Sequence, residues 1–501
     1  MSTFLNANAQ VVGPVPSPFE SIEQNSVSNM EAFGDTLWIG PGLNRNIGNG
    51  PNWFLPEGAD SVVAGRGRVY SLALASDTVF SGLGFNFQQA ESSVQTGVGY
   101  QVSTDGGDSW SFLPLPLDTE TDSTFIYGGN SYRQLPIIVA QQSPPFKTDF
   151  QGQTVFSANW ASGLMRSRDF GQRWERMILP PQSADSLVPE ESYTFISPDG
   201  SERYDPRGDQ NLLGFSVMID SDGDVWAGTA GGVNISSNAL TAPRDSVHWS
   251  HIQAEGSDLL GNWIISIEEQ PSSGDIWMTN WASGVSAGEG YGIVRTSDNG
   301  ETFDQFLQGL QINDIGFMGN HVFAAGEGGL FISPNNGQNW QRIEQIKSPN
   351  SFIKPSASYY SVATTNDRVW IGTSDGIVST ADFGETWQIS RVNFPLAGGN
   401  QYRTDAPDTE AFAYPNPFSP SRQEIVRLKF EVQSQGNVKI RLFDFGMNLI
   451  RELENRSFAP GTYEATWDGR SRNGNIVANG PVFYQVETAD NVIRGKILVL
   501  D

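Results

Sequence analysis

The feature that most constrains the fold of this chain is an internal repeat. Seven times a polar turn is followed by a short β-rich stretch that carries one aromatic residue: Trp38, Phe80, Phe156, Trp226, Trp277, Phe323 and Trp370. Consecutive aromatics are between 42 and 76 residues apart. A four-stranded propeller blade takes about 40–50 residues, so the short intervals fit one blade each and the two long ones need insertions. The repeat therefore predicts an all-β chain whose main part, residues 11–397, is a seven-bladed β-propeller.

A second signature, of the form S/T-x-D-x-G-x-x-W, recurs in five of these units. Its members are Ser103, Asp105, Gly107 and Trp110; Ser167, Asp169, Gly171 and Trp174; Thr296, Asp298, Gly300 and Phe303; Ser333, Asn335, Gly337 and Trp340; and Thr380, Asp382, Gly384 and Trp387. The hydroxyl and the carboxylate can accept hydrogen bonds from backbone N–H groups of a turn, and glycine can take a positive φ. We therefore expect structural turns here and not catalytic carboxylates.

This signature resembles the Asp-box (BNR) repeat of sialidases, sortilin-type receptors, xyloglucanases and photosystem-assembly propellers. The resemblance implies that these turns lie on the face of the propeller opposite the ligand site. A sialidase would also need an arginine triad, which the sequence does not offer in a recognisable form.

Composition excludes several classes of function. The chain has no cysteine, which rules out disulfides and thiol chemistry, and no apolar run long enough for a transmembrane helix. Its formal charge is −26, of which residues 1–411 carry about −27 and residues 412–501 about +1. A domain this acidic repels nucleic acid, whose binding requires a basic surface. We therefore expect no nucleic-acid partner.

The last 90 residues form a separate segment. After a polar linker at 398–411, strand-like alternation over 425–432, 438–445, 461–467, 482–487 and 495–500 predicts a small immunoglobulin-like (Ig-like) β-sandwich over 412–501. The opening Tyr414-Pro415-Asn416-Pro417-Phe418, the strand 439–444 and the terminal Lys496-Ile-Leu-Val-Leu500 make this segment similar to type A sorting domains of the type IX secretion system, and to an Ig-like domain of flagellar hook-cap proteins. That similarity implies an export machinery as a partner and a protein secreted by, or held at the outer surface of, a Gram-negative bacterium. Residues 1–10, with Ala7-Asn8-Ala9, read as a signal-peptide remnant.

Candidate ligand-binding residues lie in the turns between the second and third strands. Two of these turns are identical, Asn159-Trp160-Ala-Ser-Gly163 and Asn280-Trp281-Ala-Ser-Gly284, and a third is long and carries Phe85 and Phe87. A tryptophan in such a turn can stack on a sugar ring or on a partner's apolar side chain, or it can fill the gap between blades. Long connections between blades, at 111–134 and 175–213, are expected on the same face.

We therefore expect a binding or scaffold propeller that recognises an extracellular glycan or protein through this loop-rich face. The alternative is a glycoside hydrolase or lyase, for which the insertions offer many acidic residues but no identifiable catalytic pair. No cofactor or metal is expected, although the carboxylates of Asp220, Asp222 and Asp224 have the spacing of part of a calcium loop. A plain turn is the competing interpretation of that stretch.

Overall fold

The computed structural model describes Ile22 and residues 24–50, 52–54, 68–89, 92–284, 288–349, 351–392 and 410–501. The chain divides into two compact units. One consists of Met1–Ile346 and Pro355–Val392, and the other of Lys347–Lys354 and Asn393–Asp501. The expected signal-peptide remnant at 1–10 lies outside the described residues, as does the expected linker apart from residues 410 and 411.

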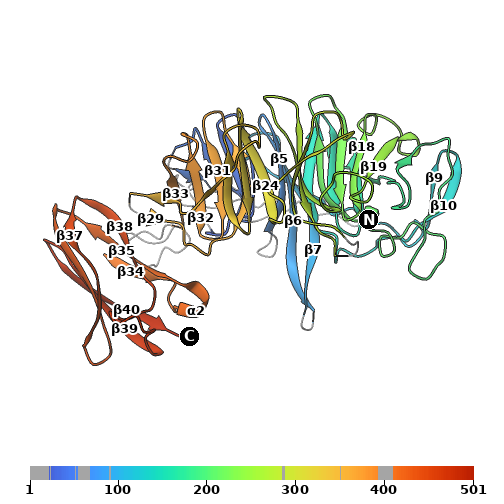
Figure 1. The fold of residues 1–501 in the computed structure, drawn as a ribbon. Coiled ribbons are helices and arrows are strands. Elements are labelled where there is room, and N and C mark those ends of the chain that lie inside the picture. Colours follow the sequence, from blue (N-terminus) through green and yellow to red (C-terminus); the bar gives the residue numbers. More distant parts are fainter. Residues whose placement is uncertain are drawn as a thin grey trace. The chain divides into compact units, whose positions relative to one another are not determined.

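The described part of the first unit contains seven larger antiparallel sheets, each built around four consecutive strands, and one two-stranded hairpin. Figure 1 shows their arrangement. The sheets are β1(Asn29–Phe33), β2(Thr36–Gly40), β3(Asn44–Ile47) and β4(Trp53–Phe54); β5(Arg68–Ala75), β6(Thr78–Gln89), β7(Ser92–Ser103) and β8(Ser111–Pro114); β11(Pro145–Gln151), β12(Thr154–Asn159), β13(Gly163–Ser167) and β14(Glu175–Arg176); β16(Gly214–Ile219), β17(Val225–Thr229), β18(Gly232–Ser236) and β19(Trp249–Ile252); β20(Trp263–Glu269), β21(Ile276–Trp281), β22(Gly292–Thr296) and β23(Asp304–Phe306); β24(Ile312–Met318), β25(His321–Gly326), β26(Gly329–Ser333) and β27(Gln341–Ile343); and β30(Tyr359–Thr364), β31(Val369–Thr373), β32(Gly376–Thr380) and β33(Gln388–Ser390).

The repeated aromatics form the core between the sheets. All seven lie near the start of the second strand of their sheet, and each has at most 3% of its surface exposed. Trp277, for example, stacks on Phe306 of its own sheet at 5.2 Å between ring centroids and contacts Phe317 of the following sheet at 5.8 Å. The repeat seen in the sequence is thus the repeat of the inter-sheet packing, which makes this unit a β-propeller.

The first strands of the sheets surround the propeller axis. Each contacts the next in the order β1, β5, β11, β16, β20, β24 and β30, and β30 contacts β1. Within the described residues, each of the seven larger sheets takes its strands from one continuous part of the chain. Residues before β1 run beside the last sheet, where the Val27 amide donates to the Thr373 carbonyl at 3.0 Å and the Gly376 amide to the Asn25 carbonyl at 2.6 Å.

Five turns between third and fourth strands share one hydrogen-bond pattern. In the turn after β7, Ser103 Oγ accepts from the Gly107 amide at 2.8 Å, and Asp105 Oδ1 accepts from the Ser109 amide at 2.8 Å. The turns that begin at Ser167, Thr296, Ser333 and Thr380 repeat both bonds, with Asn335 in the place of the aspartate in one of them. Hydrogen bonds from the hydroxyls of Ser109, Thr302 and Thr386, together with those from the amides of the same residues, lower the pKa of Asp105, Asp298 and Asp382 to about 2. A carboxylate that accepts several hydrogen bonds favours its charged form.

The two long insertions pack together beside the fourth sheet. One carries the hairpin β9(Thr124–Tyr127) and β10(Asn130–Arg133), and the other carries β15(Ser186–Leu187) and the short 3₁₀ helix η1(Gln210–Leu212). β15 pairs with β19 as a fifth strand, and Phe125, Tyr127 and Phe195 are buried in the same cluster as Trp249. β15 therefore covers part of the outer edge of the fourth sheet, which would otherwise present unpaired backbone groups.

The second unit is a two-layer β-sandwich. One sheet has the order β34(Ala411–Tyr414), β35(Val426–Val432), β38(Gly461–Trp467), and the other β37(Leu449–Phe458), β36(Gly436–Phe443), β39(Gly480–Glu487), β40(Val492–Val499). Alternate residues of both sheets, among them Phe430, Ile440 and Val486, form one buried core. The unit also contains the single-turn helix α2(Pro420–Gln423) and the hairpin β28(Lys347–Ser348) and β29(Ser351–Phe352). None of the helices in the described ranges of the chain has the length and hydropathy needed to span a membrane.

Candidate functional site

Six of the first strands carry a β-bulge at their beginning. The pairing with the second strand skips one residue in each: Tyr70, Phe146, Phe215, Ile265, Asn313 and Tyr360. A bulge leaves its extra residue out of the ladder and redirects the side chain, and bulges are frequent beside functional sites. Because these strands follow one another around the ring, the six bulged residues gather at one end of the propeller.

A cleft of about 490 Å³ lies at this end. It is lined by Asn86, Ser93, Val94, Gln95, Gln142, Pro144, Phe146, Trp160, Phe215 and Trp263. These residues come from four consecutive sheets and their connections: the long β6–β7 hairpin, the beginning of β11, the β12–β13 turn, and the first residues of β16 and β20. This hairpin extends beyond the other strands of its sheet (Figure 1).

The aromatic rings of the cleft form a continuous row. Phe215 lies 4.9 Å from Trp160 and 5.2 Å from Trp263, measured between ring centroids, and the two indoles are 6.1 Å apart. On the other side Phe215 is 6.0 Å from Phe146, which is 6.4 Å from Tyr70. All five side chains are partly exposed, and all but Tyr70 line the cleft, so four rings offer apolar surface to a ligand.

The polar side-chain groups of the cleft are three amides, one hydroxyl and the indole N–H groups of its two tryptophans. The lining residues include Asn86, Gln95 and Gln142 but no Asp, Glu, Lys, Arg or His. The backbone of Gln142 connects two sides of the cleft, since its amide donates to the Gln95 carbonyl and its carbonyl accepts from the Ala161 amide, both at 2.8 Å. Gln142 also has a φ of 60°, a strained conformation for a residue other than glycine, and such strain is concentrated at functional sites.

Only one of the six predicted binding residues lines the cleft. That residue is Trp160. Trp281, in the identical turn sequence, is not among the lining residues, and its indole N–H donates to the Ile312 carbonyl at 2.7 Å. The preceding Asn159 and Asn280 are fully buried and bond within the protein, Asn159 to Ser157 and Asn280 to the Leu260 amide. Phe85 and Phe87 lie on β6 outside the lining set, with Phe87 exposed.

A cluster of charged side chains lies on the first strands, within the ring. Lys147, the residue after Phe146, places its Nζ 3.3 Å from Glu268 of β20 and 3.5 Å from Glu31 of β1. Asp149 bonds to the Ile219 amide at 2.7 Å, and Asp314 bonds to the Val362 amide at 2.8 Å. One ammonium therefore faces four carboxylates that come from four different sheets.

Burial and mutual repulsion raise the pKa values of Glu31, Asp149 and Asp314. The pKa of Glu31 rises to about 7, mainly through burial and partly offset by Lys147, although 32% of its side-chain surface is accessible. Burial likewise raises the pKa of Asp149 and of Asp314 to about 6. Burial opposes the charge of Lys147, but Glu268 and Glu31 outweigh it and raise the pKa of the ammonium.

Three other acidic residues, Asp118 and Asp205 of the insertions and Asp220 of the candidate calcium loop, make local structural contacts. Asp118 forms an ion pair with Arg176, and Asp205 pairs with Arg207 at 2.7 Å. Asp220 accepts hydrogen bonds from the Asp222 and Asp224 amides and from the Trp226 indole, which uses both of its carboxylate oxygens in the turn. No group of three or more His, Asp or Glu side chains in the described ranges is arranged to hold a metal ion. Calcium binding at this turn stays a prediction.

Sequence reasoning missed Phe146, Phe215 and Trp263. A signal for Phe215 was present, because an aromatic residue directly precedes a serine at the start of three first strands, at Tyr70-Ser71, Phe215-Ser216 and Tyr360-Ser361. The aromatic residue of this dipeptide is the bulged residue, and in the third sheet the corresponding dipeptide is Phe146-Lys147.

Comparison with known proteins shows similarity of fold at low identity. No family model and no curated protein matches the chain. Among solved structures, YCF48 bound to D1 peptide is 16% identical, with a TM-score of 0.41 over 74% of this chain and 97% of that one. PorZ, a bacterial surface component of the type IX secretion system of Porphyromonas gingivalis, is 12% identical, with a TM-score of 0.36 over 95% and 75%. The GH74 enzyme of Niastella koreensis is 12% identical, with a TM-score of 0.47 over 95% and 73%. All three are β-propeller proteins.

Proposed function

We propose that this chain is an extracellular seven-bladed, Asp-box-type β-propeller that binds a neutral glycan in the cleft around Trp160, Phe215 and Trp263. The observation that carries the proposal is the composition of the cleft: a row of partly exposed aromatic rings flanked by amides, with no charged side chain among its lining residues. Sugar rings present apolar C–H faces, which pack on aromatic rings, and hydroxyl groups that both donate and accept hydrogen bonds. Asn and Gln side chains can do both as well.

The cleft supports binding rather than hydrolysis. Glycoside hydrolysis generally uses two carboxyl groups, about 5–10 Å apart, on either side of the scissile bond. The residues that line this cleft provide none, and Asp118 and Asp205 of the insertions are held in ion pairs.

Binding is tested on an array of neutral polysaccharides, followed by calorimetric titration of the best ligand. Trp160→Ala and Phe215→Ala should each lower the affinity at least tenfold, because each removes a ring of the row. Trp281→Ala is the matched control, since it changes the same turn sequence outside the cleft and should leave the affinity within twofold. Equal losses for Trp160→Ala and Trp281→Ala would contradict the assignment of the cleft, and the appearance of reducing ends during incubation would contradict binding without hydrolysis.

We further propose that the second unit is an Ig-like sorting domain that directs export by a type IX pathway. Support comes from its Tyr414-Pro415-Asn416-Pro417-Phe418 opening and from a two-sheet sandwich with a core of its own. A chain without residues 412–501 should then fold but stay in the periplasm of a host that has this pathway. A periplasmic reporter that carries these residues should reach the surface or the medium. If the truncated chain is still exported and the reporter is retained, the domain has another role.

A further inference from the structure

The second unit contains eight residues from the middle of the chain. Lys347–Lys354 lie between β27 and β30 in the sequence, yet they group with Asn393–Asp501 and not with the sheets on either side of them. They form the hairpin of β28 and β29, whose Lys347 pairs with Phe352 and whose Ser348 pairs with Ser351.

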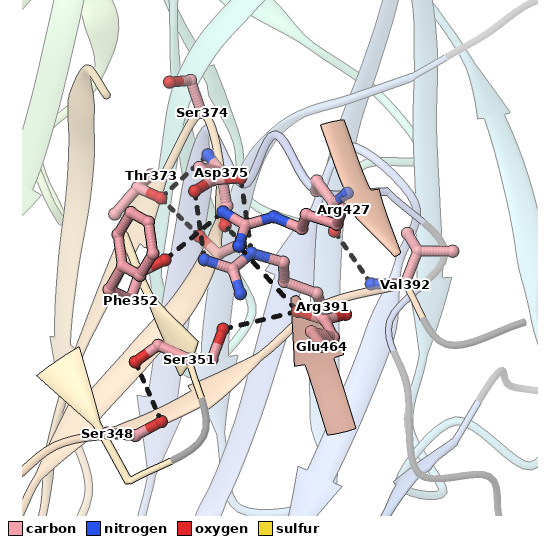
Figure 2. Close-up of polar contacts among 12 residues, drawn as sticks. Ser348, Ser351, Phe352, Thr373, Ser374, Asp375, Arg391, Val392, Arg427 and Glu464 are labelled. Atoms are coloured by element: carbon pink, nitrogen blue, oxygen red, sulfur yellow. Dashed lines mark hydrogen bonds and ion pairs between the residues drawn. The ribbon is translucent and has the colours of Figure 1, made fainter. Parts of the chain in front are cut away.

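The hairpin contacts β35 and β38 of the sandwich through two side chains. The Phe352 carbonyl accepts a hydrogen bond from Arg427 Nη2 at 3.3 Å, and the Arg427 guanidinium also lies over the Phe352 ring, 5.5 Å from its centroid. Ser351 Oγ donates to Glu464 Oε2 at 3.5 Å. Figure 2 shows both side chains of the sandwich directed toward the hairpin.

The surface that contacts the hairpin, formed by Arg427 and Glu464, buries charged side chains, which is unusual for the outer face of a sheet. Arg427 lies between Val426 and Leu428, whose side chains are in the sandwich core, so Arg427 is on the opposite face of β35. Only 4% of its side chain is exposed, whereas an arginine on such a face normally keeps its charged group in water. Glu464, which lies 3.8 Å from Arg427 and also accepts a hydrogen bond from the Tyr414 hydroxyl, supplies the opposite charge.

The geometry points to an intramolecular ligand: we propose that Lys347–Lys354 bind the sandwich at a peptide-docking surface made by Arg427 and Glu464. The guanidinium recognises a backbone carbonyl and an aromatic ring together, and the carboxylate recognises a hydroxyl, which suits a short segment with a serine followed by an aromatic residue. The sandwich is therefore connected to the rest of the chain twice, covalently through 393–409 and non-covalently through the hairpin. Cutting the covalent connection should leave the sandwich bound.

The test uses the full chain with a specific protease site inserted within 398–409. After cleavage, the fragment that begins near residue 410 should co-elute with the rest of the protein in size-exclusion chromatography. Phe352→Ala and Arg427→Ala should each weaken its retention at least tenfold, whereas Lys347→Ala, at an exposed position of the same hairpin, should retain it. Phe352→Ala leaves the sandwich sequence unchanged, and fluorescence of Trp467 in the released fragment checks that the fragment is folded.

Two results would overturn the proposal. One is separate elution of the fragment from the otherwise unsubstituted cleaved protein. The other is full retention in both Phe352→Ala and Arg427→Ala, which would place the attachment elsewhere. Neither result depends on glycan binding or on export, so failure here is distinct from failure of the proposed function.

Discussion

Replacing Lys147 by methionine would remove the only cation described among four carboxylates of the ring. Methionine keeps the length and most of the volume of the side chain, so the change is mainly one of charge. At the 3.3 Å separation from Glu268, the attraction between unit charges is about 5 kcal/mol at an effective dielectric constant near 20. Removing one partner of a buried ion pair costs about 3–5 kcal/mol, and since 28% of the Lys147 side chain is accessible to water we expect about 3 kcal/mol at pH 8.

The loss should depend on pH. The pKa values of about 7 for Glu31 and about 6 for Asp149 and Asp314 lie above the ordinary carboxyl values of 4.5 and 3.8. Between about pH 4 and 7 the folded protein therefore binds more protons than the unfolded chain, and its stability falls as the pH rises through that window. At pH 5 Glu31, Asp149 and Asp314 are largely protonated, so Lys147 then faces fewer carboxylates and Lys147→Met should cost less than at pH 8.

Urea unfolding followed by tryptophan fluorescence at pH 5 and pH 8 measures the effect. All of the 14 tryptophans except Trp467 lie in the first unit, so the signal reports on the propeller. In the double variant Lys147→Met/Glu268→Gln one carboxylate is lost together with the cation, and the double variant should be more stable than Lys147→Met at pH 8. An equal loss for Lys147→Met at both pH values would refute the electrostatic reasoning, because lost packing does not titrate.

Three further outcomes are expected. Trp387→Ala should cost about 3–5 kcal/mol in thermal unfolding, since the ring is 93% buried, and Trp160→Ala should cost clearly less because that ring is partly exposed in the cleft. Gly107→Ala should destabilise by about 1–3 kcal/mol in the same assay, because the new Cβ would lie 2.5 Å from the Trp38 ring and the φ of 94° disfavours a side chain. Below pH 4 the stability that the lowered pKa of Asp382 provides is lost as the pH falls toward 2, so Asp382→Asn should show a smaller acid-induced loss of melting temperature than the unsubstituted protein.

The strands could be predicted closely because their signals are local. In the last sheet, alternation and the turns at Asn366-Asp367 and Ser374-Asp375 predict, from the sequence alone, strands at 360–364, 368–372, 376–380 and 387–391. The observed strands are Tyr359–Thr364, Val369–Thr373, Gly376–Thr380 and Gln388–Ser390. Each residue of such a strand depends on its immediate neighbours and on which face is buried.

The cleft could not be predicted from the sequence, because it is formed by contacts between sheets that no local sequence pattern specifies. Trp160 and Trp281 occur in the same five-residue sequence, but their surroundings come from the following sheets. Beside Trp160 the bulged residue of the next sheet is Phe215, whose ring continues the aromatic row. In the sheet after Trp281 that position is Asn313, and the Trp281 indole bonds instead to the Ile312 carbonyl next to it. The hairpin at Lys347–Lys354 was also missed, because its grouping with the sandwich rests on residues far away in the sequence.

At most positions of a sheet, one residue must both fit the hydrogen-bonded ladder and pack against the next sheet, but a bulged residue is free of the first requirement. A paired residue in a first strand has to suit both the ladder and the packing against the next sheet, so a change there affects stability. The bulged residues, from Tyr70 to Tyr360, occupy no place in the pairing register, and an exchange of one for another leaves every strand where it was. We therefore expect substitutions at these six positions to cost less stability than substitutions at paired positions, and if the proposed binding at this end is correct, these are the positions where a designed library should be randomised.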